Sequence, residues 1–295
     1  MRLATQSFPV SATAPFDAVS LLTFLGKRTI TGVETYAVEP GLIRYARTVR
    51  LPHGPGMVSL VWTGRSLLAT TRTARADGEE AAAVVARLCD ADAPATAIAA
   101  HLARSEPLGR LVAIRPGLRV PGTVDAAEMA VRTLIGQQIS LAAAATGAAK
   151  LAAAYGEAAD LPDPALTRLF PTAHALAAVD PEVLAMPRRR GRALVGLARA
   201  VADGTVDLTA EPPGPQRRKA LLALPGIGPW TVDYLAMRAF GDRDVLLDTD
   251  LVVKRELVRR GITSTAEWAP YRSYATMHLW FGSGVLTEPR STTLA

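Results

Sequence analysis

The stretch Leu224-Pro225-Gly226-Ile227-Gly228-Pro229-Trp230-Thr231 decides the fold. It joins two helical runs, and its two glycines can adopt backbone angles that residues with side chains rarely reach. The proline after them suits the first turn of a following helix. Backbone N–H groups at such a helix start attract phosphate, because they lack partners and because the helix dipole favours negative charge there. By itself the stretch favours an ordinary turn between helices, so its meaning depends on what surrounds it.

A carboxylate follows this hairpin in Leu247-Asp248-Thr249-Asp250-Leu251. A phosphate-binding turn paired with an aspartate indicates an enzyme that works on DNA. Asp250 also fits as the N-cap of a helix that begins at Leu251, and one residue can serve both roles. Asp248 is the competing candidate, but its spacing to the hairpin is the less favourable one.

The composition agrees with a nucleic-acid partner and excludes several other kinds of site and structure. The 295 residues carry a net charge of +6, with 49% hydrophobic and 20% charged residues, which is typical of a globular chain with a polyanionic partner. The single cysteine, Cys89, excludes an internal disulfide framework and a cysteine-ligated zinc or iron–sulfur cluster within one chain. No apolar run approaches the roughly 20 residues of a membrane span. We expect a cytoplasmic monomer without a membrane partner.

The two ends of the chain differ in pattern. Residues 1–105 predict an α+β domain with a small antiparallel sheet, because β-rich runs at 33–38, 43–49, 57–62 and 67–70 alternate with Pro-Gly turns. Residues 106–295 predict a mainly α-helical core. Asp125 and Ser140 are expected to cap helices, Asp180-Pro181 is a further helix start, and a helix is expected over 216–222.

The wider set of motifs is specific. In order, the chain carries Arg115-Pro116-Gly117-Leu118-Arg119-Val120-Pro121-Gly122, Leu134-Ile135-Gly136-Gln137-Gln138-Ile139-Ser140, Met186-Pro187-Arg188-Arg189-Arg190, the hairpin, Asp250 and Pro270-Tyr271-Arg272-Ser273-Tyr274-Ala275. The chain thereby resembles the helix-hairpin-helix (HhH-GPD) DNA glycosylase superfamily, and within it the AlkA-type DNA-3-methyladenine glycosylase II enzymes. The resemblance implies an AlkA-type N-terminal domain at 1–105. It also implies an HhH-GPD core at 106–295, with residues 126–242 as the hairpin subdomain and 106–125 plus 243–295 as the second subdomain.

The resemblance implies a base-excision repair enzyme with Asp250 as its catalytic carboxylate. Its partner would be double-stranded DNA containing damaged bases. The enzyme would flip out an alkylated purine of the 3-methyladenine or 7-methylguanine type and hydrolyse the N-glycosidic bond, leaving an abasic site. Trp230 stands where strand-cleaving relatives carry a lysine nucleophile, which implies no AP lyase activity. A glycosylase for oxidised, deaminated or mismatched bases and a catalytically silent lesion-binding protein stay open as alternatives.

The same resemblance assigns the base pocket and the wedge that fills the gap left by a flipped base. Pocket or pocket-wall positions fall to Trp230, Tyr234, Trp280 and Phe24, whose π faces suit a cationic base. Taken alone, Tyr234 and Phe24 are better explained as core residues. The wedge position holds Gln138, where the compared enzyme has an apolar residue, and Gln137 is the alternative wedge.

The contacts to the DNA backbone are the last expectation. They would come from backbone N–H groups of Gly226, Gly228 and Thr231, and from Arg272. The arginines at 188–190 are equally well explained as a solvated helix start. The superfamily's hairpins imply a monovalent cation, Na⁺ or K⁺, on the backbone carbonyls of Leu222, Leu224 and Ile227, and no other cofactor is expected.

Overall fold

The N-terminal part of the chain is built around a five-stranded antiparallel sheet. The computed structural model describes residues 3–208 and 214–286. The strand order is β1-β5-β4-β3-β2, with β1 at Ala4–Pro9, β2 at Glu34–Glu39, β3 at Leu42–Leu51, β4 at Gly54–Trp62 and β5 at Leu67–Thr73. The four predicted strands are confirmed. The sequence pattern does not predict β1, an edge strand whose polar residues Thr5, Gln6 and Ser7 are exposed and give little hydrophobic signal.

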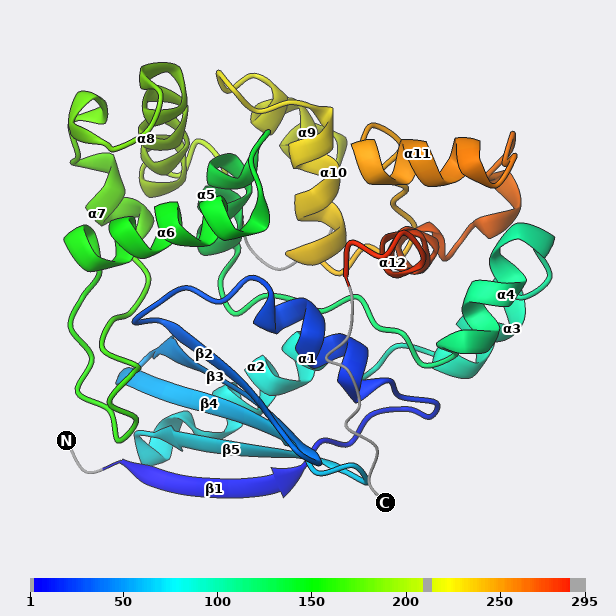
Figure 1. Cartoon of the computed structure of the whole chain (residues 1–295). Coiled ribbons are helices and arrows are strands. Elements are labelled where there is room, and N and C mark those ends of the chain that lie inside the picture. Colours follow the sequence, from blue (N-terminus) through cyan, green and yellow to red (C-terminus); the bar gives the residue numbers. More distant parts are fainter. Residues whose placement is uncertain (1–2, 209–213, 287–295) are drawn as a thin grey trace.

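Two helices, α1 (Ala18–Gly26) and α2 (Gly78–Cys89), pack against this sheet. Tyr45, Leu60 and Ala69 are aligned in neighbouring strands and share a core with both helices. Asp17 caps α1 by accepting the Ser20 N–H at 2.9 Å. Figure 1 shows α1 lying between the sheet and the helical layer, so its last turns reach the helical part of the molecule.

The hairpin subdomain is a helical unit with its own core. Its helices are α5 (Ala126–Gly136), α6 (Leu141–Tyr155), α7 (Ala173–Ala177), α8 (Arg188–Ala202), α9 (Pro215–Leu222) and α10 (Pro229–Arg238). The predicted caps are confirmed, since Asp125 accepts the Glu128 N–H and Ser140 accepts the Ala143 N–H. The start signal at Asp180-Pro181 produces only the 3-10 helix η2 (Pro181–Val183), which Pro187 and the longer α8 then follow.

The second subdomain gathers helices from distant parts of the chain. It contains α3 (Ala95–Leu102), α4 (Glu106–Ile114), α11 (Leu251–Arg259), the 3-10 helix η3 (Ala266–Trp268) and α12 (Arg272–Gly282). Ile98 and Leu102 of α3 are buried in the same core as Trp268 and Leu279. Figure 1 likewise shows α3 and α4 beside α12, away from the sheet. α3 therefore packs with the helical core, and the domain boundary at residue 105 stays a prediction.

Buried charges join the sheet to the hairpin subdomain. Arg47 of β3 donates to Glu128 of α5 at 2.7 Å and to Glu34 of β2 at 3.1 Å. Arg132 of α5 donates to the same two carboxylates, at 2.8 Å to Glu128 and 3.0 Å to Glu34. The Tyr45 hydroxyl adds a hydrogen bond to Glu34 at 2.7 Å. Two arginines and two glutamates thus neutralise one another at the domain boundary, and Glu34, Arg47 and Arg132 also line the cavity described next.

Candidate active site

The hairpin has the geometry of a phosphate-binding turn. Gly226 has a φ of +83°, and a Cβ at this position would lie 2.7 Å from the Cβ of Ala193, so both the backbone angle and the space require glycine. Gly228 is the N-cap of α10 and provides no side-chain cap. The first-turn N–H groups of Trp230 and Thr231 lie directly after it. A helix start capped only by glycine suits an external anion.

Asp250 is held by four N–H donors. Its Oδ1 accepts the backbone N–H groups of Val252 and Val253 at 2.9 and 3.1 Å, which makes it the N-cap of α11 as its position predicts. The indole N–H of Trp280 also donates to Oδ1, and that of Trp230 donates to Oδ2, both at 3.2 Å. No ion pair with Asp250 is found among the described residues. Neutral dipoles therefore hold the carboxylate, and its negative charge stays available to a cation.

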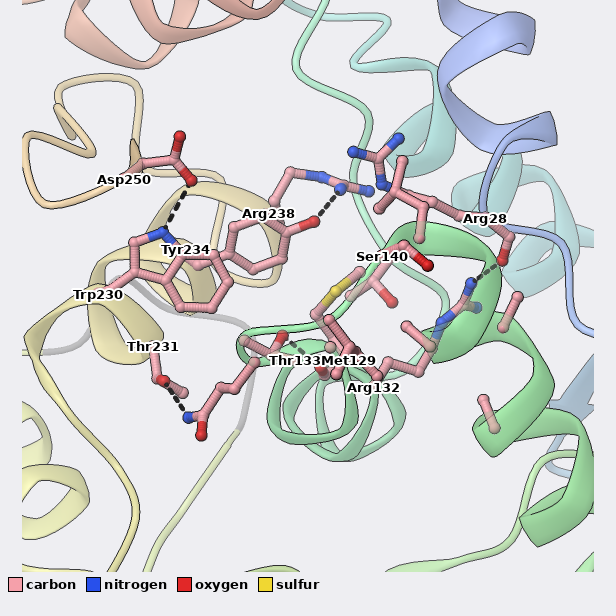
Figure 2. A pocket seen from close by; sticks show the side chains of 18 of the residues that line it. Arg28, Met129, Arg132, Thr133, Ser140, Trp230, Thr231, Tyr234, Arg238 and Asp250 are labelled. Carbon is pink, nitrogen blue, oxygen red and sulfur yellow. Dashed lines mark hydrogen bonds between the residues drawn. The ribbon is translucent and has the colours of Figure 1, made fainter. Parts of the chain in front are cut away.

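Aromatic rings form the wall beside this carboxylate. Trp230 and Tyr234, one turn apart on α10, stack with centroids 5.3 Å apart, and Trp280 of α12 lies 6.3 Å from Tyr234. Trp230, Tyr234 and Asp250 line a cavity of about 1400 Å³ (Figure 2). Trp280 lines the same cavity. Phe24 is different. It stacks on Trp280 at 6.2 Å but is fully buried and does not reach the cavity, so it backs the wall instead of facing a base.

Two arginines at the end of the cavity remote from Asp250 escaped the sequence analysis. Arg238 donates to the Tyr234 hydroxyl at 2.9 Å, and the guanidinium carbon of Arg28 lies 3.6 Å from the centroid of the Phe24 ring. Both arginines line the cavity. Each stands four residues after an aromatic residue predicted to line the pocket. For Tyr234 and Arg238 that spacing places both side chains on one face of α10, which is a signal that the sequence contains.

Gln137 and Gln138, in the turn between α5 and α6, differ in their contacts and in their exposure. The amide nitrogen of Gln137 donates to the carbonyl of Gly226 and to the hydroxyl of Thr231, both at 3.0 Å, while its own backbone carbonyl accepts from Arg190 at 2.8 Å. Gln138 is exposed at the cavity rim and has a φ of +58°. The bonds of Gln137 tie the turn to the hairpin, whereas Gln138 is the more accessible wedge candidate.

Comparison with known proteins agrees with this geometry. Residues 7–125 match the AlkA N-terminal domain family. The chain is 37% identical over 280 residues to DNA-3-methyladenine glycosylase 2 of Escherichia coli, covering 92% of this chain and 95% of that protein. It is 39% identical to a probable bifunctional transcriptional activator/DNA repair enzyme AlkA of Mycobacterium tuberculosis, covering 94% of this chain and 57% of the relative's length. The chain belongs to the AlkA family of DNA-3-methyladenine glycosylases.

A solved structure supports the fold of this AlkA-family chain. The 3-methyladenine DNA-glycosylase of Archaeoglobus fulgidus superposes with a TM-score of 0.77 at 18% identity, covering 95% of this chain and 98% of that one. The predicted α+β N-terminal domain and helical core are therefore confirmed. Within the described ranges, no helix is long and apolar enough to cross a membrane, and no group of three His, Cys, Asp or Glu residues could hold a metal ion.

Arg272, which we predict to contact DNA, is bound to a carboxylate of its own chain. Its guanidinium makes a paired contact with Asp244, at 2.8 and 2.7 Å, and its backbone N–H bonds the same carboxylate. Hydrogen bonding to Arg272 lowers the pKa of Asp244. The pair joins the start of α12 to the loop between α10 and α11, and Arg272 does not line the cavity. In this AlkA-family chain its clearest role is structural.

Proposed function

We propose that this chain is a base-excision repair glycosylase that removes alkylated purines of the 3-methyladenine or 7-methylguanine type from duplex DNA. The observation that carries the proposal is the carboxylate of Asp250, held by neutral N–H donors at an aromatic cavity. The hairpin start of α10 adjoins the same cavity, because Gly228, Trp230 and Asp250 all line it. A helix start that can bind phosphate, a negative charge and aromatic rings for stacking thus lie around one cavity, as base flipping requires.

The chemistry follows from where the charge develops. When the N-glycosidic bond breaks, the base leaves with the bonding electron pair, and positive charge builds on the deoxyribose ring. Asp250 stabilises that charge, and its fixed position means that little reorganisation is needed in the transition state. A water oxygen then bonds to C1′ and releases a proton, leaving an abasic site and a free base.

The aromatic wall supports an alkylated, cationic base. Trp230 and Trp280 present indole rings on the two sides of the Asp250 carboxylate. The negative face of an aromatic ring attracts a cation, most strongly for tryptophan. A purine that carries an extra alkyl group at N3 or N7 is positively charged while it remains attached to the sugar. The cavity therefore favours it over an undamaged purine of the same shape.

We also propose that the enzyme hydrolyses without cutting the strand. Trp230 occupies the position where strand-cleaving relatives have a lysine, and indole cannot form a Schiff base. No lysine is found among the described residues that line the cavity. Lys219 and Lys254 are exposed elsewhere on α9 and α11. An alkali step is then needed to break the abasic strand.

The hairpin supplies the grip on DNA. We propose that the N–H groups of Gly226, Gly228 and Thr231 bind phosphate, with a Na⁺ or K⁺ ion on carbonyls of Leu222, Leu224 and Ile227. The residues fit such an ion, because the Leu224 carbonyl accepts one N–H, from Ile227 at 3.1 Å, and keeps a second lone pair. Backbone carbonyls are a usual ligand for these cations. The bound ion would add positive charge beside the phosphate.

Release of free bases from methylated duplex DNA tests the proposal. Wild type should release methylated purines, with strand breaks appearing only after alkali. Asp250→Asn should release them about 10²- to 10³-fold more slowly, the usual cost of losing preorganised charge stabilisation. Asp248→Asn is the matched control, since this neighbouring aspartate is exposed and does not line the cavity. Undiminished release by Asp250→Asn would remove that residue from the mechanism, and no release by wild type would favour a lesion-binding role.

A further inference from the structure

The cavity has two chemically opposite ends. Asp250 stands at one end, and Arg238 and Arg28 stand at the other, with the stacked rings of Trp230 and Tyr234 between them (Figure 2). A purine that stacks on this wall with its glycosidic bond at Asp250 points its six-membered ring away from the carboxylate. The arginine end therefore faces the edge of the base that carries position 6.

The two arginines are not equally free to contact a base. Arg238 donates through all three of its nitrogen atoms, to the carbonyl of Pro121, the hydroxyl of Tyr234 and the carbonyl of Gly122. Arg28 donates one amino group to the Phe24 carbonyl at 2.9 Å and lies near the Tyr234 hydroxyl. A guanidinium has five N–H donors. Arg28 thus retains donor capacity at the cavity wall.

Positive charge at this end exceeds the negative charge that could balance it. Neither Arg28 nor Arg238 forms an ion pair within the described part of the chain, and the nearby Glu34 is engaged by Arg47 and Arg132. Burial, together with the positive charge of Arg238, lowers the pKa of Arg28 to about 10. Burial by itself would raise the pKa of Tyr234, yet Arg238 and Arg28 outweigh it and hold that pKa below its usual range. Such a site favours a ligand atom that accepts hydrogen bonds.

We propose that Arg28 reads position 6 of the flipped purine and favours an oxygen there, so that 7-methylguanine is preferred over 3-methyladenine. The inference rests on the proposed function. The O6 of 7-methylguanine accepts hydrogen bonds, whereas the N6 amino group of 3-methyladenine donates and meets donors. Both bases are cationic in the nucleoside, so their repulsion from the arginines is common to the two. The difference in release between the two bases therefore reports the contact at position 6.

Duplex DNA treated with dimethyl sulfate contains both bases and tests this in one reaction. Each release rate is divided by the spontaneous rate in the same DNA without enzyme. Wild type should show the larger enhancement for 7-methylguanine. Arg28→Met should lower the ratio of the two enhancements by about tenfold, the effect of losing one hydrogen bond from a charged donor. Arg28→Lys keeps a charged donor and should retain most of the wild-type ratio.

Arg65→Met, at an exposed position between β4 and β5, is the matched control and should leave the ratio unchanged. A larger wild-type enhancement for 3-methyladenine would overturn the inference. So would an Arg28→Met enzyme that slows both bases equally, because Arg28 would then only support the wall. Release of neither base by wild type would instead refute the proposed function. Thermal unfolding of each variant distinguishes loss of folding from loss of selectivity, and if Arg28→Met does not fold, the wild-type ratio of the two enhancements still tests the inference.

Discussion

Two sets of carboxylates in this molecule are stabilised in opposite ways. Glu34 and Glu128, at the domain boundary, are buried and matched by Arg47 and Arg132. Asp250, at the cavity, is partly exposed and receives only neutral N–H donors. Burial alone would raise the pKa of Glu34, but Arg132 and Arg47 hold it below its usual range.

The difference separates a structural charge from the charge that we propose to be catalytic. The negative charges of Glu34 and Glu128 are already neutralised, because each carboxylate contacts two guanidinium groups. Asp250 is fixed by dipoles that orient it without cancelling it, so a cationic sugar can still be stabilised. The comparison predicts that changes at the boundary act on stability, while changes around Asp250 act on turnover.

The largest expected effect is on stability, at Arg47. Arg47→Met leaves both glutamates with Arg132 as their only cation and removes the contact between β3 and α5. Breaking a buried ion pair from one side typically costs about 3–5 kcal/mol. Urea unfolding should show this loss, while the folded fraction keeps a near-normal rate of base release.

Asp250→Asn is the reciprocal variant. Asparagine is as good an N-cap as aspartate, so the free energy of unfolding should change by less than about 1 kcal/mol. The same unfolding measurement checks it. If Asp250→Asn proved as destabilising as Arg47→Met, the Asp250 carboxylate would be structural. The distinction between the two sets of carboxylates would then no longer hold.

A further prediction concerns the hydrogen bond from Trp230 to Asp250. Trp230→Phe keeps an aromatic ring beside Tyr234 but removes the N–H that bonds Asp250 Oδ2 at 3.2 Å. A hydrogen bond to a charged group is worth about 1.5–3 kcal/mol, so single-turnover base release should slow by about tenfold or more. Weaker DNA binding at an unchanged rate would mean that the indole only stacks and does not orient the carboxylate.

Sequence alone could predict the parts of this site that lie on local motifs. Asp250 follows a recognisable hairpin and begins a helix, Trp230 lies within the hairpin motif itself, and four of the five strands carry a clear hydrophobic and turn pattern. Each of these signals is contained in a short window.

The remaining features depend on residues that only folding brings together. Arg47 and Glu128 are 81 positions apart, and Gln137 and Thr231 are 94 apart. No local pattern distinguishes such a buried arginine from an exposed one. The packing of α3 has the same origin, because α3 reads as an ordinary helix until its partners in the core of the second subdomain are known.

A smaller effect is expected at the turn beside the cavity. Gln137→Ala removes both side-chain hydrogen bonds to the hairpin, at Gly226 and Thr231. Since the bonds position the turn and touch no reacting atom, KM for methylated DNA should rise about fivefold to tenfold, with kcat changed less than about twofold. Gln216→Ala, at an exposed position on α9, is the matched control. A fall in kcat alone would place Gln137 in the chemistry and remove its role as a link.

The smallest effect concerns Asp90, a carboxylate that belongs to neither set. It is half-buried and accepts from the Tyr274 hydroxyl at 2.8 Å and the Val120 N–H at 3.1 Å. Burial raises its pKa to about 6, although these bonds partly oppose the rise. Because the folded state then binds a proton more readily than the unfolded state, Asp90 disfavours folding above pH 6 and does so less as the pH falls.

The free energy of unfolding measured at pH 7.5 and at pH 5 isolates this contribution. Relative to Asp90→Asn, wild type should gain about 1 kcal/mol on acidification over this interval. The asparagine variant would keep an acceptor for Tyr274 and Val120 but could not titrate, so changes common to both proteins cancel. An equal pH dependence in the two proteins would mean that Tyr274 and Val120 stabilise the ionised carboxylate as fully as arginines stabilise Glu34. Neutral donors would then stabilise the Asp90 carboxylate as well as they hold Asp250. The exposure of Asp250 would no longer explain why that carboxylate needs no cation.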